Sequence, residues 1–346
     1  MAYYDWNKTL SYDADVTIVI TPRGTGKTYG IRLQGIRDYL KSGYRFVELV
    51  RYKSELDTVS SSYFTRIERN NHFPDKVFKT DSKHMYIADK PANEDDKPKW
   101  EIIGYFIAMT QYQKVKKRTF DKVKRIILDE GVLDRRDRYY RYLKSEFIAL
   151  ASIVDTVSRE RADDESIRPH IYICGNACDI SNPYFIRYGI NDPKPGYSWY
   201  GGKTCLLHYM LDREYTQAKR DETVAGRMLA GVDNTSDIDG IFANDFKPSK
   251  RPKTSTYIFG LSYLNQTLGV WRDHGHWYVS REIDGRSSGN ILAVTKDDKS
   301  TNGMMAVRAR KALQSFGDYH VSGLVDYEDA HVARLFLDIL SIFGVK

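Results

Sequence analysis

The stretch from Val16 to Thr28 constrains the fold of this chain more than any other part of its 346 residues. Five β-prone residues, Val16–Ile20, lead into a turn that ends in Gly26-Lys27-Thr28, and a helical pattern follows. A turn of this kind presents backbone N–H groups and the positive end of a helix dipole, which together bind phosphate. The stretch therefore predicts a P-loop nucleotide site, although a Gly-Lys-Thr sequence can also be no more than a surface turn.

The residues of this turn have separate expected roles. Lys27 would reach the β- and γ-phosphates of ATP, and the Thr28 hydroxyl would ligate Mg²⁺. The turn departs from the P-loop pattern at Thr21, where glycine is expected. The residues expected to bind the nucleotide are Arg23, Gly24, Thr25, Gly26, Lys27 and Thr28.

A second half of a nucleotide site follows about a hundred residues later. The short apolar run Arg125–Leu128 ends in Asp129 and Glu130, which fits a buried parallel strand. Asp129 is expected to hold Mg²⁺, and Glu130 to polarise an attacking water. A carboxylate pair at a strand end can also serve solvation alone. After a phosphate-binding turn, in this order, the pair indicates an ATP hydrolase.

Composition narrows the class of protein. The chain carries 53 Lys and Arg against 46 Asp and Glu, a net charge of +7, which weakly favours a polyanionic partner. No apolar stretch approaches the roughly 20 residues that a bilayer span needs, and the first residues lack the pattern of a signal peptide. The three cysteines form no metal-ligand pattern. These features predict a cytosolic protein with reduced thiols and no membrane association.

The order of predicted elements divides the chain. Strands alternating with helices over residues 1–210 predict a mostly parallel sheet with ligands at the carboxyl ends of its strands. Residues 54–120 leave this pattern and are expected to form a lid-like insertion with a hairpin. A linker is expected over 211–253. Residues 254–346, with three consecutive strand patterns before helical sequence, predict a smaller α/β domain.

Several short motifs, in this order, resemble the DNA-packaging ATPases of φ29-like tailed phages. The resemblance covers nearly the whole chain, and the ordered set is specific although no single motif is. The motifs are Arg23–Thr28, Val50–Leu56, Leu128–Glu130, Asp155–Arg161, Asn176-Ala177, Asn182–Phe185 and Thr267–Trp271.

This resemblance implies a fold and a machine. The fold would be an additional-strand, conserved-glutamate P-loop ATPase of the FtsK/HerA-like type, followed by a C-terminal RNase H-like domain derived from a nuclease. The machine would be a ring, typically a pentamer, that sits transiently on the portal vertex of an empty prohead in the host cytoplasm. The ring would pump double-stranded DNA, with ATP and Mg²⁺ as its cofactors. Whether a structural RNA bridges motor and portal stays open.

The resemblance also implies roles for three further residues. Asn176 would be the polar sensor of the γ-phosphate, unless it only caps the next turn. Arg159 would be an arginine finger that reaches the ATP of the neighbouring subunit, unless it only complements a helix C-terminus. Lys53 would act on a neighbouring nucleotide or on the lid, unless it is an exposed lysine without such a role.

Two basic clusters compete for contact with DNA, whose phosphates a motor should touch without reading sequence. The first follows the Asp129 strand, where it can project into a ring channel, and is slightly favoured; it consists of Arg135, Arg136 and Arg138. The second is denser but precedes the strand; it consists of Lys114, Lys116, Lys117 and Arg118.

The C-terminal domain lacks a feature that an RNase H-like nuclease needs. Such a nuclease gathers several carboxylates around two metal ions, the first on its opening strand. The predicted opening strand, Tyr257–Tyr263, has no acidic residue, and the acidic group Asp326, Glu328 and Asp329 reads as a turn or helix cap. The domain is therefore expected to be inactive as a nuclease. Two rival functions remain: a terminase with an active nuclease, and a small-molecule P-loop kinase.

Overall fold

A computed structural model describes residues 4–93, 95–133, 142–143, 145–159, 167–180, 182–228, 242, 249–264, 266–285, 290–295, 298, 311–321 and 324–345. The chain forms two compact units, Met1–Ala243 and Asn244–Lys346. Their boundary falls inside the segment 211–253, where the sequence predicts a linker. None of the helices in the described part of the chain combines the length and the apolar character that a bilayer span requires.

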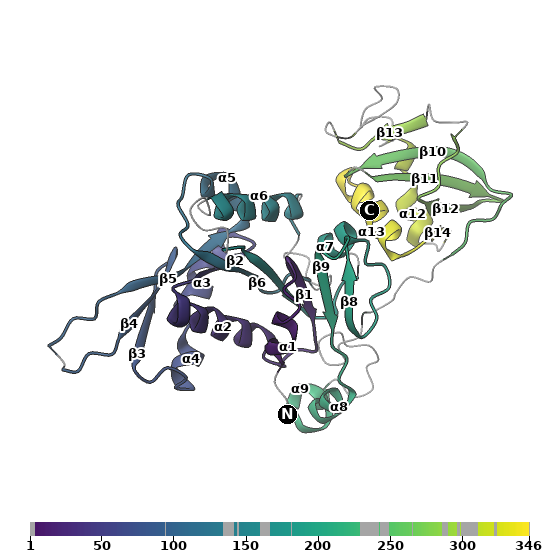
Figure 1. Ribbon diagram of the computed structural model, residues 1–346. Coiled ribbons are helices and arrows are strands. Elements are labelled where there is room, and N and C mark those ends of the chain that lie inside the picture. Colours follow the sequence, from purple (N-terminus) through teal and green to yellow (C-terminus); the bar gives the residue numbers. More distant parts are fainter. Residues whose placement is uncertain are drawn as a thin grey trace. The chain divides into compact units, whose positions relative to one another are not determined.

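The first unit is built on one large sheet (Figure 1). Among the described residues it has nine strands in the order β3-β4-β5-β2-β6-β7-β1-β9-β8. Six neighbouring strands, β5-β2-β6-β7-β1-β9, run parallel to one another. Antiparallel strands extend the sheet at both edges. The strands are β1 Val16–Ile20, β2 Arg45–Val50, β3 Lys76–Thr80, β4 His84–Asp89, β5 Glu101–Ala108, β6 Val123–Leu128, β7 His170–Gly175, β8 Gly196–Tyr200 and β9 Cys205–Tyr209.

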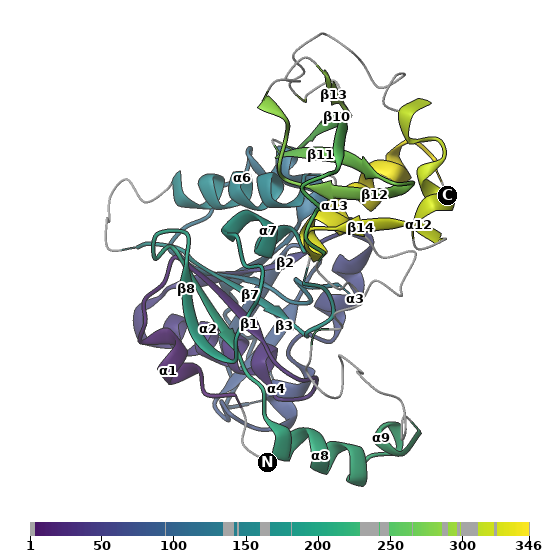
Figure 2. The same ribbon diagram turned by 90° about the vertical axis from the view of Figure 1, so that its right-hand side faces the viewer.

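Helices cover both faces of this sheet, with α2 on one side and α6 on the other (Figures 1 and 2). The described helices are α1 Trp6–Leu10, α2 Lys27–Ser42, η1 Lys53–Glu55, α3 Leu56–Ser61, α4 Thr65–Arg69, η2 Met109–Gln111, α5 Tyr112–Val115, α6 Glu146–Ser158, α7 Pro183–Tyr188, α8 Arg213–Glu222 and α9 Val224–Met228.

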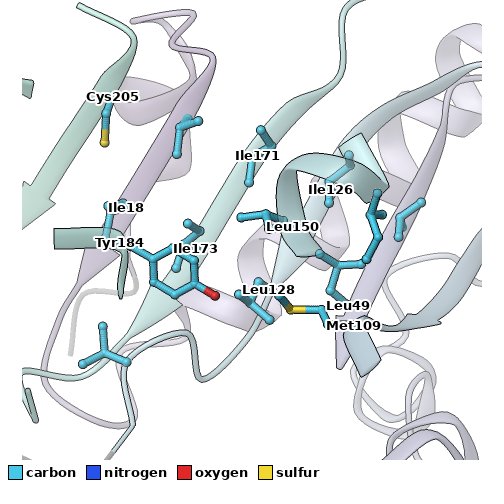
Figure 3. Packing of buried hydrophobic residues seen from close by; sticks show 14 of the residues in the cluster. Ile18, Leu49, Met109, Ile126, Leu128, Leu150, Ile171, Ile173, Tyr184 and Cys205 are labelled. Atoms are coloured by element: carbon cyan, nitrogen blue, oxygen red, sulfur yellow. The ribbon is translucent and has the colours of Figure 1, made fainter. Parts of the chain in front are cut away.

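The core has two layers because side chains of a strand point alternately to opposite faces. Ile18 and Ile20 of β1 pack with Leu150 of α6 on one face. Val19 packs with Ile31 of α2 on the other. Figure 3 shows the α6 side of this core, where Ile18, Ile173, Leu128 and Leu150 lie together. Burial on both faces explains why the central strands read as continuous apolar runs.

The strand order confirms the predicted fold class. The phosphate-loop strand β1 and the Asp129 strand β6 are not neighbours, because β7 pairs in parallel with both. This is the additional strand that the resemblance implies. The carboxyl ends of β1, β6 and β7 therefore meet at one edge of the sheet, where open α/β sheets place their ligands.

Residues 54–120 do not form the lid-like insertion expected from the sequence. Strand β5 lies inside the parallel sheet, where Phe46 to Val50 of β2 pair with Gly104 to Ala108. Strands β3 and β4 extend the same sheet as an antiparallel hairpin. The physical reason is the apolar run in β5, whose Ile103, Phe106 and Ile107 are buried and need cover on both faces. The sequence also predicts strands about Met85–Ala88 and Trp100–Ala108 in this segment, and they correspond to β4 and β5, but both strands belong to the sheet itself.

The second unit is a separate, smaller α/β fold with a mixed sheet in the order β13-β10-β11-β12-β14. The three consecutive strands that the sequence predicts are confirmed as β10, β11 and β12, which pair antiparallel. Strands β13 and β14 pair in parallel at the two edges. Helix α13 packs Val332, Phe336 and Ile339 into the core of this unit. The elements are β10 Thr256–Tyr263, β11 Gln266–Asp273, β12 His276–Ser280, β13 Ile291–Ala293, α12 Phe316–Val321, β14 Val325–Tyr327 and α13 Ala330–Ile342.

Asp329 is the N-cap residue of α13, in agreement with the helix cap expected from the sequence. Its carboxylate accepts a hydrogen bond of 2.9 Å from the Val332 amide and pairs with Arg281 at 2.6 Å. Burial alone would raise the pKa of Asp329, but the bonds from Arg281 and Val332 outweigh it and lower the pKa. The carboxylate therefore stabilises the fold at neutral pH, and this contribution is lost as the pH falls below the ordinary pKa of an aspartate.

Replacing Asp329 by Ala is expected to lower the free energy of unfolding of the C-terminal unit by about 1 kcal/mol, because one orphan amide of α13 loses its cap. Asp329→Asn is the control, since it keeps a cap acceptor without the charge, and it should lose less. Denaturant unfolding at pH 7 measures both. Equal losses would show that the ion pair with Arg281, rather than the cap, carries the effect.

Candidate nucleotide-binding and catalytic site

The turn between β1 and α2 has the backbone of a phosphate-binding loop. Gly24 and Gly26 adopt φ angles of 95° and 78°, in the left-handed region that favours glycine. A Cβ at Gly24 would also lie 2.7 Å from the Tyr215 hydroxyl. Gly26 is the N-cap residue of α2, so the first amides of this helix open toward the turn. These amides are the groups that would hold phosphate.

Thr21, the departure from the expected pattern, braces the turn. Its hydroxyl lies 2.7 Å from that of Thr25 and donates to the Pro22 carbonyl at 3.0 Å. Thr21 is fully buried, and its φ is not positive, so the position does not need glycine in this chain. At the position where the P-loop pattern has glycine, this chain therefore has a threonine whose hydroxyl makes a contact across the turn.

Donors from outside the turn bind three of its carbonyl groups. The Tyr4 amide donates to the Thr25 carbonyl at 2.9 Å, and the Trp6 indole donates to the Lys27 carbonyl at 2.7 Å. From α8, the Tyr215 hydroxyl and the Lys219 ammonium both donate to the Arg23 carbonyl, at 3.0 and 2.7 Å. Sequence reasoning missed all four donors, because nothing in their local patterns relates them to the turn.

Two contacts join the predicted site residues across the sheet. The Lys27 ammonium donates to the Asn176 side-chain oxygen at 2.7 Å, and the Thr28 hydroxyl donates to the Asp129 carboxylate at 2.7 Å. Burial lowers the pKa of Lys27. The partners in these two contacts are 149 and 101 positions apart in sequence. They meet at the edge of the sheet where β1, β6 and β7 end.

The donor set around Asp129 fits Mg²⁺. A hydroxyl from Thr28 and a carboxylate from Asp129 are the hard oxygen ligands that this cation prefers. The Asp129 carboxylate is oriented by the amide of Glu130 at 3.0 Å. Arg32, which pairs with the buried Glu48, lies 3.8 Å from the other Asp129 oxygen and helps to balance its charge. A metal ion here would be held by Thr28 and Asp129.

Glu130 follows β6 in an uncommon conformation, with a φ of 50° in the left-handed region. Its side chain is accessible to solvent, as a group that activates water must be. Partial burial of the carboxylate nevertheless raises the pKa of Glu130, and the neighbouring Asp129 raises it further. A raised pKa brings a carboxylate closer to the range in which a general base works efficiently.

The remaining predicted residues are not brought to this site by a contact in the described part of the structure. Arg159 follows α6, where its guanidinium is 53% exposed and pairs with Asp155 at 2.9 Å. Lys53 is exposed at the start of η1. The arginines Arg135, Arg136 and Arg138 lie outside the described residues. In the competing cluster, Lys114, Lys116 and Lys117 are exposed.

Comparison with known proteins places the chain in a family. The family model for the Podovirus DNA encapsidation protein (Gp16) matches residues 1–335. The DNA packaging protein of Bacillus phage PZA is 31% identical over 310 residues, which are 88% of this chain and 86% of that protein. The corresponding protein of Bacillus phage phi29 is 30% identical over the same shares.

Solved structures agree with this assignment. A chain of the bacteriophage Phi-29 viral genome packaging motor assembly matches with a TM-score of 0.71 and 25% identity, over 99% of this chain and 100% of that chain. The Phi-28 gp11 DNA packaging motor matches in fold, with a TM-score of 0.65 and 18% identity over 99% and 98% of the two chains. The chain therefore belongs to the Podovirus DNA encapsidation protein family.

Proposed function

We propose that this chain is an ATP hydrolase that drives double-stranded viral DNA into an empty prohead. The observation that carries the proposal is the convergence of Lys27 with Asn176, and of Thr28 with Asp129, at one edge of the sheet. Glu130 lies next to this pair of contacts. The DNA packaging proteins among its relatives support DNA as the cargo.

In the proposed mechanism, amides of the turn from Arg23 to Thr28 and the Lys27 ammonium hold the phosphates of ATP. Thr28 and Asp129 would hold Mg²⁺, and the ion would neutralise charge on the phosphates. Glu130 accepts a proton from the attacking water. Asn176, already in contact with Lys27, senses whether the γ-phosphate is present.

Hydrolysis by this mechanism is completed by a neighbouring subunit in a ring, which we propose to be a pentamer on the portal. Arg159 would supply the finger that stabilises charge on the transferring phosphoryl group. Lys53, exposed just after β2, would act on the nucleotide of a neighbouring subunit. The motor would work in the host cytoplasm, docked to the prohead directly or through a structural RNA.

The test of this function is ATP hydrolysis by the purified protein with and without double-stranded DNA. A motor should hydrolyse ATP faster when DNA is present, whereas a small-molecule P-loop kinase should not respond to DNA. Packaging of DNA into purified proheads, followed by nuclease protection, measures the coupled reaction. A rate of ATP hydrolysis that is the same with and without DNA at every salt concentration would contradict the proposal.

The proposed DNA contacts give a salt-dependent prediction. Each lost phosphate contact should lower the magnitude of the slope of log affinity against log salt concentration by about 0.9, without changing sequence preference. Replacing Arg135, Arg136 and Arg138 by Ala should therefore flatten the slope and leave basal ATP hydrolysis intact. The matched control replaces Lys114, Lys116 and Lys117. If only the control flattens the slope, that cluster grips the DNA instead.

The terminase alternative needs an active nuclease in the C-terminal unit. Strand β10 has no acidic residue. The Asp329 carboxylate caps α13, and the Glu328 carboxylate accepts a hydrogen bond from the Arg281 amide. Within the described residues, no three His, Cys, Asp or Glu side chains are grouped to hold a metal ion. We therefore expect no cleavage when the protein is incubated with plasmid and Mn²⁺. Metal-dependent cleavage abolished by Asp326→Ala would establish the alternative.

A further inference from the structure

A buried ion pair contacts the backbone of the proposed catalytic glutamate. Arg51, the residue after β2, and Glu146, the first residue of α6, have side chains that are 1% and 0% exposed. The Arg51 guanidinium donates to both Glu146 carboxylate oxygens, with Nε–Oε2 2.9 Å and Nη2–Oε1 2.7 Å. A bidentate pair of this kind fixes the plane of the guanidinium as well as its position.

The same guanidinium also holds the backbone that follows β6. Its Nη1 donates to the carbonyl of Glu130 at 3.1 Å, and its Nη2 donates to the carbonyl of Gly131 at 3.0 Å. Glu130 has its φ in the left-handed region, which is unfavourable for a residue with a side chain. Such a conformation persists only where its surroundings impose it. The two bonds from Arg51 are contacts that impose it.

Glu146 is itself fixed from two further directions. The Tyr184 hydroxyl donates to Oε1 at 2.6 Å, and the Leu143 amide donates to Oε2 at 2.8 Å. Tyr184 is fully buried and lies in the core layer with Leu128 and Leu150 (Figure 3). A buried charge pair is tolerated when its remaining hydrogen-bonding capacity is satisfied, as it is here. Arg51 and Tyr184 each lie in one of the motifs of the sequence, Val50–Leu56 and Asn182–Phe185, and the proposed function gives neither residue a role.

We propose that Arg51, oriented by Glu146 and Tyr184, is a positioning residue that holds the backbone of Glu130 so that its carboxylate stays aimed at the attacking water. The inference rests on the proposed function and extends it. Arg51 acts through Glu130 and does not touch the reacting atoms. Lysine cannot replace it, because a single ammonium lacks the planar fork that reaches a carboxylate and two carbonyls together.

The test compares Arg51→Lys with Arg125→Lys. Arg125 is a matched control at the other end of β6, since it is also buried and pairs with a carboxylate, Asp38 at 2.6 Å, and a tyrosine, Tyr172 at 2.9 Å. Both variants should lose thermal stability. Only Arg51→Lys should lower kcat, by about 10²-fold, because a small misplacement of a catalytic group has an effect of this size. ATP affinity in an equilibrium binding assay should stay near that of the wild type.

A double variant separates positioning from general damage. When Glu130 is already Gln, adding Arg51→Lys should lower kcat hardly further, because the group that it positions is gone. Tyr184→Phe, which removes one bond to Glu146, should give a smaller fall in kcat and serves if Arg51→Lys does not fold. Equal kcat for Arg51→Lys and Arg125→Lys, or a full additional loss in the Glu130→Gln background, would overturn the inference. If Glu130→Gln itself leaves kcat unchanged, the proposed function is wrong and the inference falls with it.

Discussion

Replacing Glu130 by Gln is expected to lower ATP turnover by about 10²–10⁴-fold while ATP still binds. The amide keeps the shape of the side chain and one acceptor oxygen, but it cannot accept a proton from water. The contacts of Lys27 with Asn176 and of Thr28 with Asp129 do not involve the Glu130 side chain. Single-turnover hydrolysis measures the loss, and equilibrium binding of a fluorescent ATP analogue measures affinity.

Lys27→Ala is the matched control for this experiment, because it removes the cation on the phosphates and leaves the base in place. It should weaken nucleotide binding itself, and excess ATP should therefore restore part of its turnover. An equal loss of binding in both variants would show that the two roles have been misassigned.

Replacing Arg159 by Ala is expected to lower hydrolysis by about 10³–10⁵-fold, because a finger supplied by a neighbouring subunit is worth this much in turnover. ATP binding should stay nearly normal, since Arg159 has no contact with its own site among the described residues and pairs with Asp155. Hydrolysis and binding are measured as for Glu130→Gln. Asp155→Ala is the control, because it removes the same surface ion pair and keeps the guanidinium.

Mixing two inactive variants tests whether Arg159 acts between subunits. The Glu130→Gln variant keeps its finger but has an inactive site, and the Arg159→Ala variant keeps its site but has no finger. A mixed ring places some intact fingers beside intact sites, so the mixture should regain ATP hydrolysis that neither variant has alone. A mixture that stays inactive while subunits demonstrably exchange would assign Arg159 to its own subunit or to a structural role.

Tertiary structure decided the features that depend on residues far apart in the chain. The run Glu101–Ala108 is apolar in sequence, but only the pairing of β5 with β2 placed it inside the sheet rather than in an insertion. Arg51 and Glu146 are 95 positions apart, and each resembles an ordinary surface charge until the other is beside it. No local sequence pattern predicts the hydrogen bonds that Tyr4, Trp6 and α8 donate to the phosphate loop.

The sequence by itself determined the fold class of the first unit and the residues to expect at the candidate nucleotide site. Strand, glycine turn and Lys27-Thr28 are local in the chain, and so is the apolar run that ends in Asp129 and Glu130. Parallel strands bring such ends to one edge of a sheet, so these short patterns predicted that Asp129 would lie near the phosphate loop, whereas the role of Asn176 was implied by the family resemblance. What surrounds and orients these groups was decided only by folding, because burial and pairing of a charge are properties of the packed molecule and not of a segment.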